Sequence, residues 1–203
     1  MNIDFPNPLG LAAGMDKNGE AVPSWQSIGY GFCEIGGVTL HEQPGNPKPR
    51  MFRASKDKAL INRMGFNNIG ARGLKKQLQY WKDMGLWPDS PVGINLGKSK
   101  KTPLEEAPSD YAGSIRILWK HTDFFVINVS SPNTPNLRAL QDKTPLTELL
   151  SLLKCEMTSM PIYKPILLKI APDLSSTQLD DIISIMLEVK IDGLIATNTT
   201  IDR

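Results

Sequence analysis

The chain has 203 residues, of which 40% are hydrophobic and 22% charged, with a formal net charge of +2. This composition is typical of one globular domain with its own core, and the small net charge favours neither nucleic acid nor a membrane as a partner. Because Cys33 and Cys155 are far apart and form no CxxC motif, neither a disulfide framework nor a metal site is expected.

Short apolar runs recur along the chain, and each ends in polar or glycine-rich residues. They cover residues 9–14, 31–39, 92–97, 124–131, 165–173 and 193–200. Each run has the length of a strand, and nearly continuous apolar runs are typical of parallel strands covered on both faces. Helical patterns lie between several of them, at residues 18–30, 67–85, 109–121, 144–157 and 174–189. The alternation predicts an α/β fold with a parallel sheet.

The longest interruption runs from Gly37 to Met64 and is rich in glycine, proline and basic residues. We expect a long functional loop there, because structureless loops of this length are uncommon in compact domains unless they serve the site.

The residues at the ends of the apolar runs distinguish between two possible α/β folds, a doubly wound sheet and a barrel. A doubly wound sheet concentrates its site at one switch point, whereas a barrel gathers the carboxyl ends of all its strands around one mouth. Every run here is followed or ended by a polar residue suited to ligand contact: Lys17, Thr39, Asn95, Asn128 with Ser131, Lys169 and Asn198. This pattern favours a TIM barrel.

Asparagines and lysines are the candidate binding groups. A single asparagine is usually a turn residue, but several at strand ends can read a planar ring with alternating C=O and N–H edges, such as a flavin or a pyrimidine. Lys169 lies inside an apolar run and needs an anionic or polar partner if it is buried. Lys17 sits in a glycine-rich turn, where either ligand contact or simple surface exposure is possible.

Two nucleotide motifs are excluded. The segment "GINLGKS" has three residues between its glycines, where a P-loop needs four, and the chain has no GxGxxG. A Walker NTPase and a Rossmann dehydrogenase are therefore both disfavoured.

The residues match a known family in six motifs: "NPLGLAAGMDKNGE", "INRMGFNN", "GINLGKSK", "NVSSPNTPNLRALQ", "LLKIAPDLS" and "DGLIATNTTIDR". In this order they resemble dihydroorotate dehydrogenase, specifically its membrane-associated, quinone-reducing class. The resemblance runs almost from end to end of the chain. It implies a (β/α)₈ barrel with FMN at its mouth. The implied reaction oxidises (S)-dihydroorotate to orotate in pyrimidine (UMP) biosynthesis, with ubiquinone or menaquinone as electron acceptor.

The resemblance also implies catalytic roles. Ser131 matches the catalytic base, and Thr134 and Phe66 match the positions that hold a relay water. A serine at this position is typical of the quinone class, since the soluble classes usually carry cysteine. Pro132 and Pro135 restrict the backbone beside the base.

Binding roles carry over position by position. The resemblance implies substrate contacts from Lys17, Asn62, Arg63, Met64, Gly65, Phe66, Asn128, Asn133, Asn198 and Thr199. It implies FMN contacts from Ala13, Gly14, Lys17, Gly37, Asn95, Asn128, Lys169 and Thr197. Gly37 departs from the family pattern, which usually has threonine or serine there. A hydroxyl contact to the flavin is thus not expected.

The extent of the resemblance leads to expectations about the chain. We expect residues 1–203 to form one FMN-binding barrel domain with strands 1–6, without the last two βα units and without the N-terminal element that docks the family's quinone class on the membrane. The complete enzyme is then expected at the cytoplasmic face of the membrane, and this chain, without a signal peptide or spanning segment, soluble in the cytoplasm. The alternatives are a catalytically silent fragment, half of a split enzyme, or an FMN barrel acting on another reduced pyrimidine.

Overall fold

A six-stranded, all-parallel sheet forms the centre of the computed structural model, which describes residues 2–134 and 136–202. Its strand order is β1-β2-β5-β6-β7-β8. The strands are β1 (Gly10–Leu11), β2 (Phe32–Val38), β5 (Val92–Leu96), β6 (Phe124–Asn128), β7 (Ile166–Ile170) and β8 (Gly193–Ala196). Each of the six predicted runs contains one of these strands, so the prediction of a parallel sheet is confirmed.

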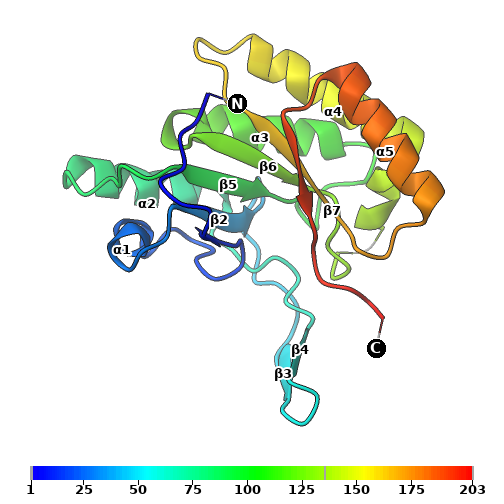
Figure 1. Ribbon diagram of the computed structural model, residues 1–203, viewed down its shortest axis with the longest axis horizontal. Coiled ribbons are helices and arrows are strands. Elements are labelled where there is room, and N and C mark those ends of the chain that lie inside the picture. The colour runs from blue at the N-terminus through cyan, green and yellow to red at the C-terminus, as the bar shows by residue number, and fades with distance from the viewer. Residues whose placement is uncertain (1, 135, 203) are drawn as a thin grey trace.

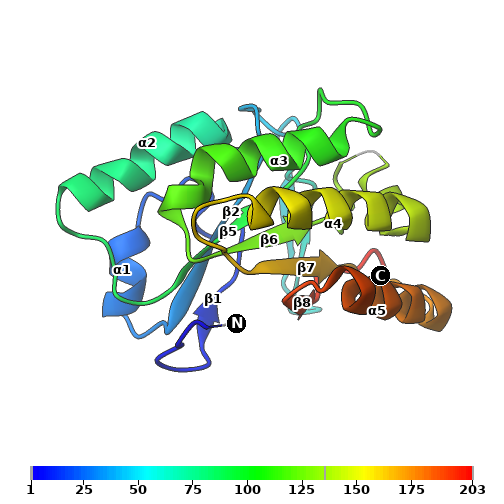
Figure 2. The same ribbon diagram turned by 90° about the horizontal axis from the view of Figure 1, so that it is seen from above.

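Helices follow the strands and cover the outer face of the sheet. They are α1 (Val22–Ser27), α2 (Gly70–Asp83), α3 (Ala107–Leu118), α4 (Lys143–Thr158) and α5 (Ser176–Val189), with short 3₁₀ helices η1 (Trp119–His121) and η2 (Leu137–Gln141). Figures 1 and 2 show α2, α3 and α4 side by side along the sheet, with α5 next to α4. All five predicted helical segments are confirmed.

The two faces of the sheet differ in chemistry. Side chains alternate between the faces along each strand. Outward residues such as Ile35, Ile94 and Ile127 are fully buried in the hydrophobic core formed with the helices. The inward positions of β2 and β7 carry Glu34 and Lys169 instead, whose charged atoms lie 3.7 Å apart. Since β5 and β6 separate these two strands, the contact shows that the sheet curls strongly, as a barrel wall does.

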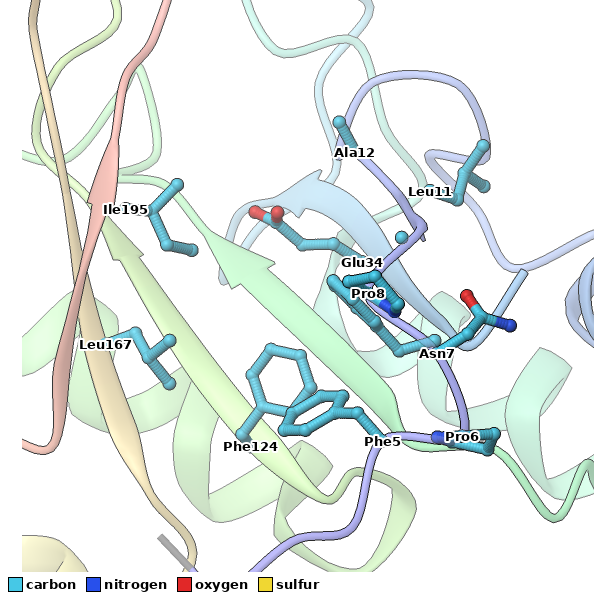
Figure 3. Close-up of a pocket in the computed structure, with 12 residues that line it drawn as sticks. Phe5, Pro6, Asn7, Pro8, Leu11, Ala12, Glu34, Phe124, Leu167 and Ile195 are labelled. Atoms are coloured by element: carbon cyan, nitrogen blue, oxygen red, sulfur yellow. The ribbon is translucent and has the colours of Figure 1, made fainter.

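The curled sheet is open between its end strands, β1 and β8. A cavity of about 760 Å³ lies on this side and is lined by residues that include Leu11, Leu167 and Ile195 (Figure 3). The incomplete TIM barrel predicted from the sequence is therefore the observed architecture of the described residues.

Aromatic rings close the amino-terminal end of the barrel interior. The Phe5 ring packs edge-on against Phe32, with ring centroids 5.0 Å apart. It packs in the same way against Phe124, with ring centroids 6.2 Å apart (Figure 3). Neighbouring glycines make room for these rings, since a Cβ on Gly10 would lie 2.1 Å from the Phe32 ring and one on Gly93 would lie 2.2 Å from the Phe124 ring. The apolar plug leaves the opposite, carboxyl-terminal end of the strands for polar chemistry.

The prediction of one long loop from Gly37 to Met64 is wrong in part. The segment contains an antiparallel hairpin of β3 (Met51–Ala54) and β4 (Ala59–Asn62), which projects away from the sheet in Figure 1. Its strands are four residues each, largely exposed, and joined by a turn without the glycine that usually marks a hairpin. The sequence of these two strands does not alternate between apolar and polar residues, so it did not predict them.

Among the helices of residues 2–134 and 136–202, none combines the length and the apolar character needed to cross a membrane.

The buried His121 is expected to make the folded state less stable at acidic pH. Burial first, and then the positive charge of nearby lysines, lowers the pKa of His121 to about 4 from an ordinary 6.5. Between these values the folded state binds fewer protons than the unfolded state, so stability is lost as the pH falls from 6.5 towards 4. The expected loss is about 3 kcal/mol.

Urea denaturation at several pH values measures this effect. His121→Leu is expected to flatten the pH dependence in that window, whereas His41→Leu at an exposed position leaves it unchanged. An equally steep pH dependence in His121→Leu would refute the assignment.

Candidate active site

The polar residues that follow the strands gather around one cavity of about 230 Å³ at the carboxyl-terminal end of the sheet. It is lined by Ala13, Gly14, Lys17, Gly37, Met51, Asn62, Met64, Gly65, Phe66, Asn128, Ser131, Asn133, Lys169, Asn198 and Thr199. All of these except Met51 are among the residues predicted from the sequence. Segments from five strands and the hairpin thus meet at one place, as the barrel interpretation requires.

Four predicted site residues do not line the cavity: Arg63, Asn95, Thr134 and Thr197. The Arg63 guanidinium donates to the Pro49 carbonyl at 3.1 and 2.9 Å, so its side chain is engaged elsewhere. The Thr197 hydroxyl donates to the carbonyl of the next residue at 3.0 Å. Asn95 and Thr134 are buried, and neither lines the cavity.

Ser131 lies three residues beyond β6 and is 7% exposed. Its Oγ accepts a hydrogen bond from the backbone N–H of Asn133 at 3.3 Å. A hydrogen bond to the charged form of a group favours that form, so this N–H favours loss of the serine proton. Pro132 fixes the backbone next to Ser131, whereas Pro135 lies outside the described residues.

The hairpin supplies one wall of the cavity. Asn62, the last residue of β4, accepts a hydrogen bond at Oδ1 from the Asn133 side-chain amide at 3.0 Å. Met51 is the cross-strand partner of Asn62 and so reaches the same wall. Because the segment carries no strand pattern, sequence reasoning could not place Met51 opposite Asn62.

Lys17 is held at the cavity by the turn after β1. The Asp16 carboxylate fixes this turn by accepting from the backbone N–H groups of Glu20 and Ala21 and from the Trp25 indole, at 2.8, 3.0 and 3.0 Å. Burial first, and then the nearby Arg50 cation, hold the pKa of Lys17 below the ordinary lysine value. This half-buried lysine is suited to bind an anion, which would relieve the repulsion between the two cations.

Lys169 has the anionic partner that the sequence required. Its Nζ lies 3.7 Å from the Glu34 carboxylate, and the two side chains are 10% and 7% exposed. Sequence reasoning missed Glu34 because it lies inside the apolar run of residues 31–39. The available signal was the alternation of strand residues, which turns Glu34 to the inner face between two core positions.

Buried asparagines connect the strands by side-chain hydrogen bonds. The Asn95 amide group donates to the Glu34 carboxylate, and the Asn128 amide donates to Asn95 Oδ1 at 3.0 Å. Asn198 donates in turn to Asn128 Oδ1 at 3.3 Å and to the Ser130 hydroxyl at 3.0 Å. These amides present fixed donors and acceptors at the carboxyl ends of β5, β6 and β8.

Gly14 contributes bare backbone to the lining of the cavity. Gly14 has φ +109°, and a Cβ built there would meet no atom within 4 Å, so its backbone is bare towards open space. A backbone without a side chain permits close approach of a planar ligand. Together with the amides and the two lysines, this surface fits a planar heterocycle with alternating carbonyl and N–H edges.

The family model described as dihydroorotate dehydrogenase matches residues 1–203. The chain belongs to the dihydroorotate dehydrogenase family.

Relatives and solved structures agree with the family assignment. Two relatives are both named dihydroorotate dehydrogenase (quinone). The one from Nostoc punctiforme is 54% identical to this chain over 201 residues, and the one from Mycobacterium tuberculosis is 50% identical over 201 residues. These alignments cover 99% of this chain but 52% and 54% of the relatives. A crystal structure of ligand-free DHODH from Eimeria tenella superposes with a TM-score of 0.92 at 38% identity, covering 100% of this chain and 62% of that one. The chain thus spans about half the length of the curated dihydroorotate dehydrogenases it matches.

The absence of a side chain at Gly37 has a packing role. A Cβ at Gly37 would lie 2.8 Å from a ring carbon of Phe66 and 3.1 Å from Asn95 Oδ1. The Phe66 ring therefore occupies the space that a side chain at position 37 needs. Gly37→Ala is expected to destabilise the fold by about 1–3 kcal/mol, because overpacking forces neighbouring atoms to move.

Chemical denaturation measures this loss, with Gly193→Ala as the matched control. A Cβ at Gly193 would lie 3.5 Å from Leu167, an ordinary contact, so little change is expected there. Equal stability of the Gly37 and Gly193 variants would contradict the packing role.

Proposed function

We propose that this chain forms the substrate- and flavin-facing part of a dihydroorotate dehydrogenase that oxidises (S)-dihydroorotate to orotate in pyrimidine biosynthesis. The observation that carries the proposal is the convergence of Ser131, Lys17 and the asparagines on one cavity in a chain of this family. The curated relatives are named as quinone enzymes, which supports a quinone, ubiquinone or menaquinone, as the final acceptor.

Ser131 is the proposed catalytic base. It takes a proton from the ring methylene of the substrate, and its position in a buried loop keeps bulk water away. A serine hydroxyl is a weak base near neutral pH, so its own proton needs a path to solvent. Phe66, which lines the cavity, and the buried Thr134 are the proposed holders of a water molecule that carries this proton away.

The substrate is recognised at both ends in this proposal. The half-buried Lys17 binds the carboxylate, since its charge has little solvent to compensate it. The amides of Asn62, Asn128, Asn133 and Asn198 bind the ring C=O and N–H groups, with Thr199 at the edge of the cavity. Met64, Gly65 and Phe66 close the cavity from the hairpin side. Arg63, whose side chain bonds the Pro49 carbonyl, contributes through its backbone.

FMN is the proposed cofactor, and when bound it accepts the hydride released from the substrate. The residues that would hold it are Ala13, Gly14, Lys17, Gly37, Asn95, Asn128, Lys169 and Thr197. The bare backbone at Gly14 and the buried Lys169 with its amide neighbours fit a flavin ring. The glycine at position 37 leaves only a backbone contact there.

Membrane association at the cytoplasmic face belongs to the proposed complete enzyme. The resemblance to the family's quinone class supports docking there. Because the chain spans about half the length of the relatives, quinone reduction and docking are proposals for the whole protein.

A substrate panel tests the proposed function. The protein to use is this chain joined to the remaining barrel units of a dihydroorotate dehydrogenase, here called the completed barrel. Under anaerobic conditions, dihydroorotate is expected to bleach the flavin absorbance, whereas dihydrouracil, which lacks the carboxylate, is not. Bleaching by dihydrouracil with no response to dihydroorotate would assign the site to another reduced pyrimidine. A completed barrel that binds flavin but responds to neither would contradict the proposal.

A further inference from the structure

Arg138 links three of the loops that leave the carboxyl ends of the strands. It lies on η2, and its guanidinium carries N–H donors in a rigid planar fork. Its Nε donates to the Ser130 carbonyl at 3.1 Å, in the loop after β6. Its Nη1 donates to the Asp173 carboxylate after β7 at 2.9 Å, and its Nη2 donates to the Thr199 carbonyl after β8 at 3.3 Å. We call Arg138 with these three acceptors the arginine clamp.

The contact with the Ser130 carbonyl acts directly on the proposed base. A peptide group is planar, so the Ser130 carbonyl and the Ser131 N–H belong to one rigid unit. The Ser130 N–H donates to Asn128 Oδ1 at 3.2 Å, but that N–H belongs to the preceding peptide group and leaves the next one free to rotate. Arg138 therefore fixes the peptide plane from which the Ser131 side chain reaches the cavity.

The other end of the arginine clamp fixes a second wall of the cavity. Thr199 lines the cavity, and its carbonyl is held by Arg138. Asp173 holds the same segment, since its carboxylate accepts from the Thr200 hydroxyl and from the Ile201 N–H. The Arg138 and Asp173 side chains are 23% and 18% exposed. Ion pairs in contact with solvent usually contribute little to stability, so the geometry that the clamp imposes is its main effect.

We infer that Arg138 is a positioning residue that holds Ser131 in place against the substrate by fixing the Ser130–Ser131 peptide group relative to the Thr199 segment. Arg138 does not line the cavity itself and acts through these two carbonyls. The inference rests on the proposed function, because it requires Ser131 to be the base. The competing explanation is that Arg138 only ties loops together and stabilises the fold. Its loss would then lower the amount of folded protein and leave the rate of the folded molecules unchanged.

Arg138→Lys in the completed barrel separates the two explanations. A lysine keeps a positive charge beside Asp173 but carries its donors on one nitrogen, so it cannot span the three acceptors. At saturating dihydroorotate, the rate of anaerobic flavin reduction is expected to fall about 10–100-fold, because a displacement of about 1 Å at the reacting groups can cost about 10²-fold. The amplitude of flavin bleaching, which reports the folded and flavin-loaded protein, is expected to change little. Arg116→Lys, which alters an arginine paired with Glu156 on the helical surface, is the matched control and should reduce at the unmodified rate.

A double variant shows whether Arg138 acts through Ser131. Ser131→Ala has no base to misplace, so adding Arg138→Lys is expected to slow flavin reduction little further. Equal fold losses with and without Ser131, or an unchanged rate in Arg138→Lys, would overturn the inference. If Arg138→Lys binds no flavin, Asp173→Asn is the milder variant, because it leaves the arginine in place and removes only its anion. A smaller loss that again depends on Ser131 is expected there, and an unchanged rate would overturn the inference.

Hydrogen exchange in the flavin-free completed barrel tests the arginine clamp independently of the proposed function. Arg138→Lys is expected to speed exchange of backbone amides in residues 129–134 and 197–201 but not in α3. Unchanged exchange in both segments would contradict the clamp. An unmodified completed barrel that binds FMN but is not reduced by dihydroorotate would refute the proposed function instead, and the exchange result would still decide whether Arg138 holds the two loops.

Discussion

Replacing Ser131 by alanine is expected to slow flavin reduction by dihydroorotate about 10²–10⁴-fold in the completed barrel, the usual contribution of a positioned base. Ser131 is buried, and its Oγ accepts the Asn133 backbone N–H, an arrangement that favours the deprotonated form. Alanine removes the proton acceptor and leaves the binding groups on the other strands in place. Affinity for orotate is therefore expected to change much less than the rate.

Anaerobic stopped-flow measurement of single-turnover flavin reduction gives the rate. Ser151→Ala, on the exposed face of α4, is the control for a serine outside the cavity and should reduce at the unmodified rate. Ser131→Cys is expected to retain more activity than Ser131→Ala, because a thiolate can accept the proton. A Ser131→Ala variant as fast as the unmodified protein would exclude Ser131 as the base.

Lys169→Met is expected to have the second large effect, on both stability and flavin binding. It leaves the Glu34 carboxylate buried without its cation, and breaking a buried ion pair in this way typically costs about 3–5 kcal/mol. It also removes a cation that we propose would face the electron-rich edge of the flavin and would stabilise its anionic reduced form. We expect weak or absent FMN binding, and a lowered flavin reduction potential in any fraction that binds.

A double variant separates the two effects of Lys169. In Glu34→Gln/Lys169→Met no uncompensated charge remains, so thermal stability is expected to recover substantially while FMN affinity stays low. Thermal unfolding and a fluorescence titration with FMN measure both quantities. Full flavin occupancy with an unchanged reduction potential in Lys169→Met would contradict the role assigned to this lysine.

The sequence predicted the strands and helices because each has a strong local signal. The run around Asn128 ends abruptly in polar residues, and Ser175 accepts from Gln178 N–H in the capping box that begins α5. The hairpin was missed because its short exposed strands are defined by cross-strand pairing, as between Met51 and Asn62. Such pairing between two segments produces no periodic pattern of apolar residues in the sequence.

The site was predicted to the extent that its residues lie in recognisable motifs at strand ends. Motif adjacency also brought in Arg63, whose side chain bonds the Pro49 carbonyl, because a motif does not tell which way a loop side chain points. Glu34 was missed for the opposite reason. Its role depends on the curl of the sheet, which brings β2 within reach of Lys169 on β7, and such a long-range contact is visible only in three dimensions.

A crystal structure of the completed barrel with FMN and orotate tests the central claim most directly. We expect the orotate carboxylate at Lys17, its ring against the amides of Asn128 and Asn198, and the ring carbon that was the methylene carbon of dihydroorotate about 3–3.5 Å from Ser131 Oγ, the separation of reacting atoms. Orotate bound with its ring away from Ser131, or in the apolar cavity between β1 and β8, would contradict the account.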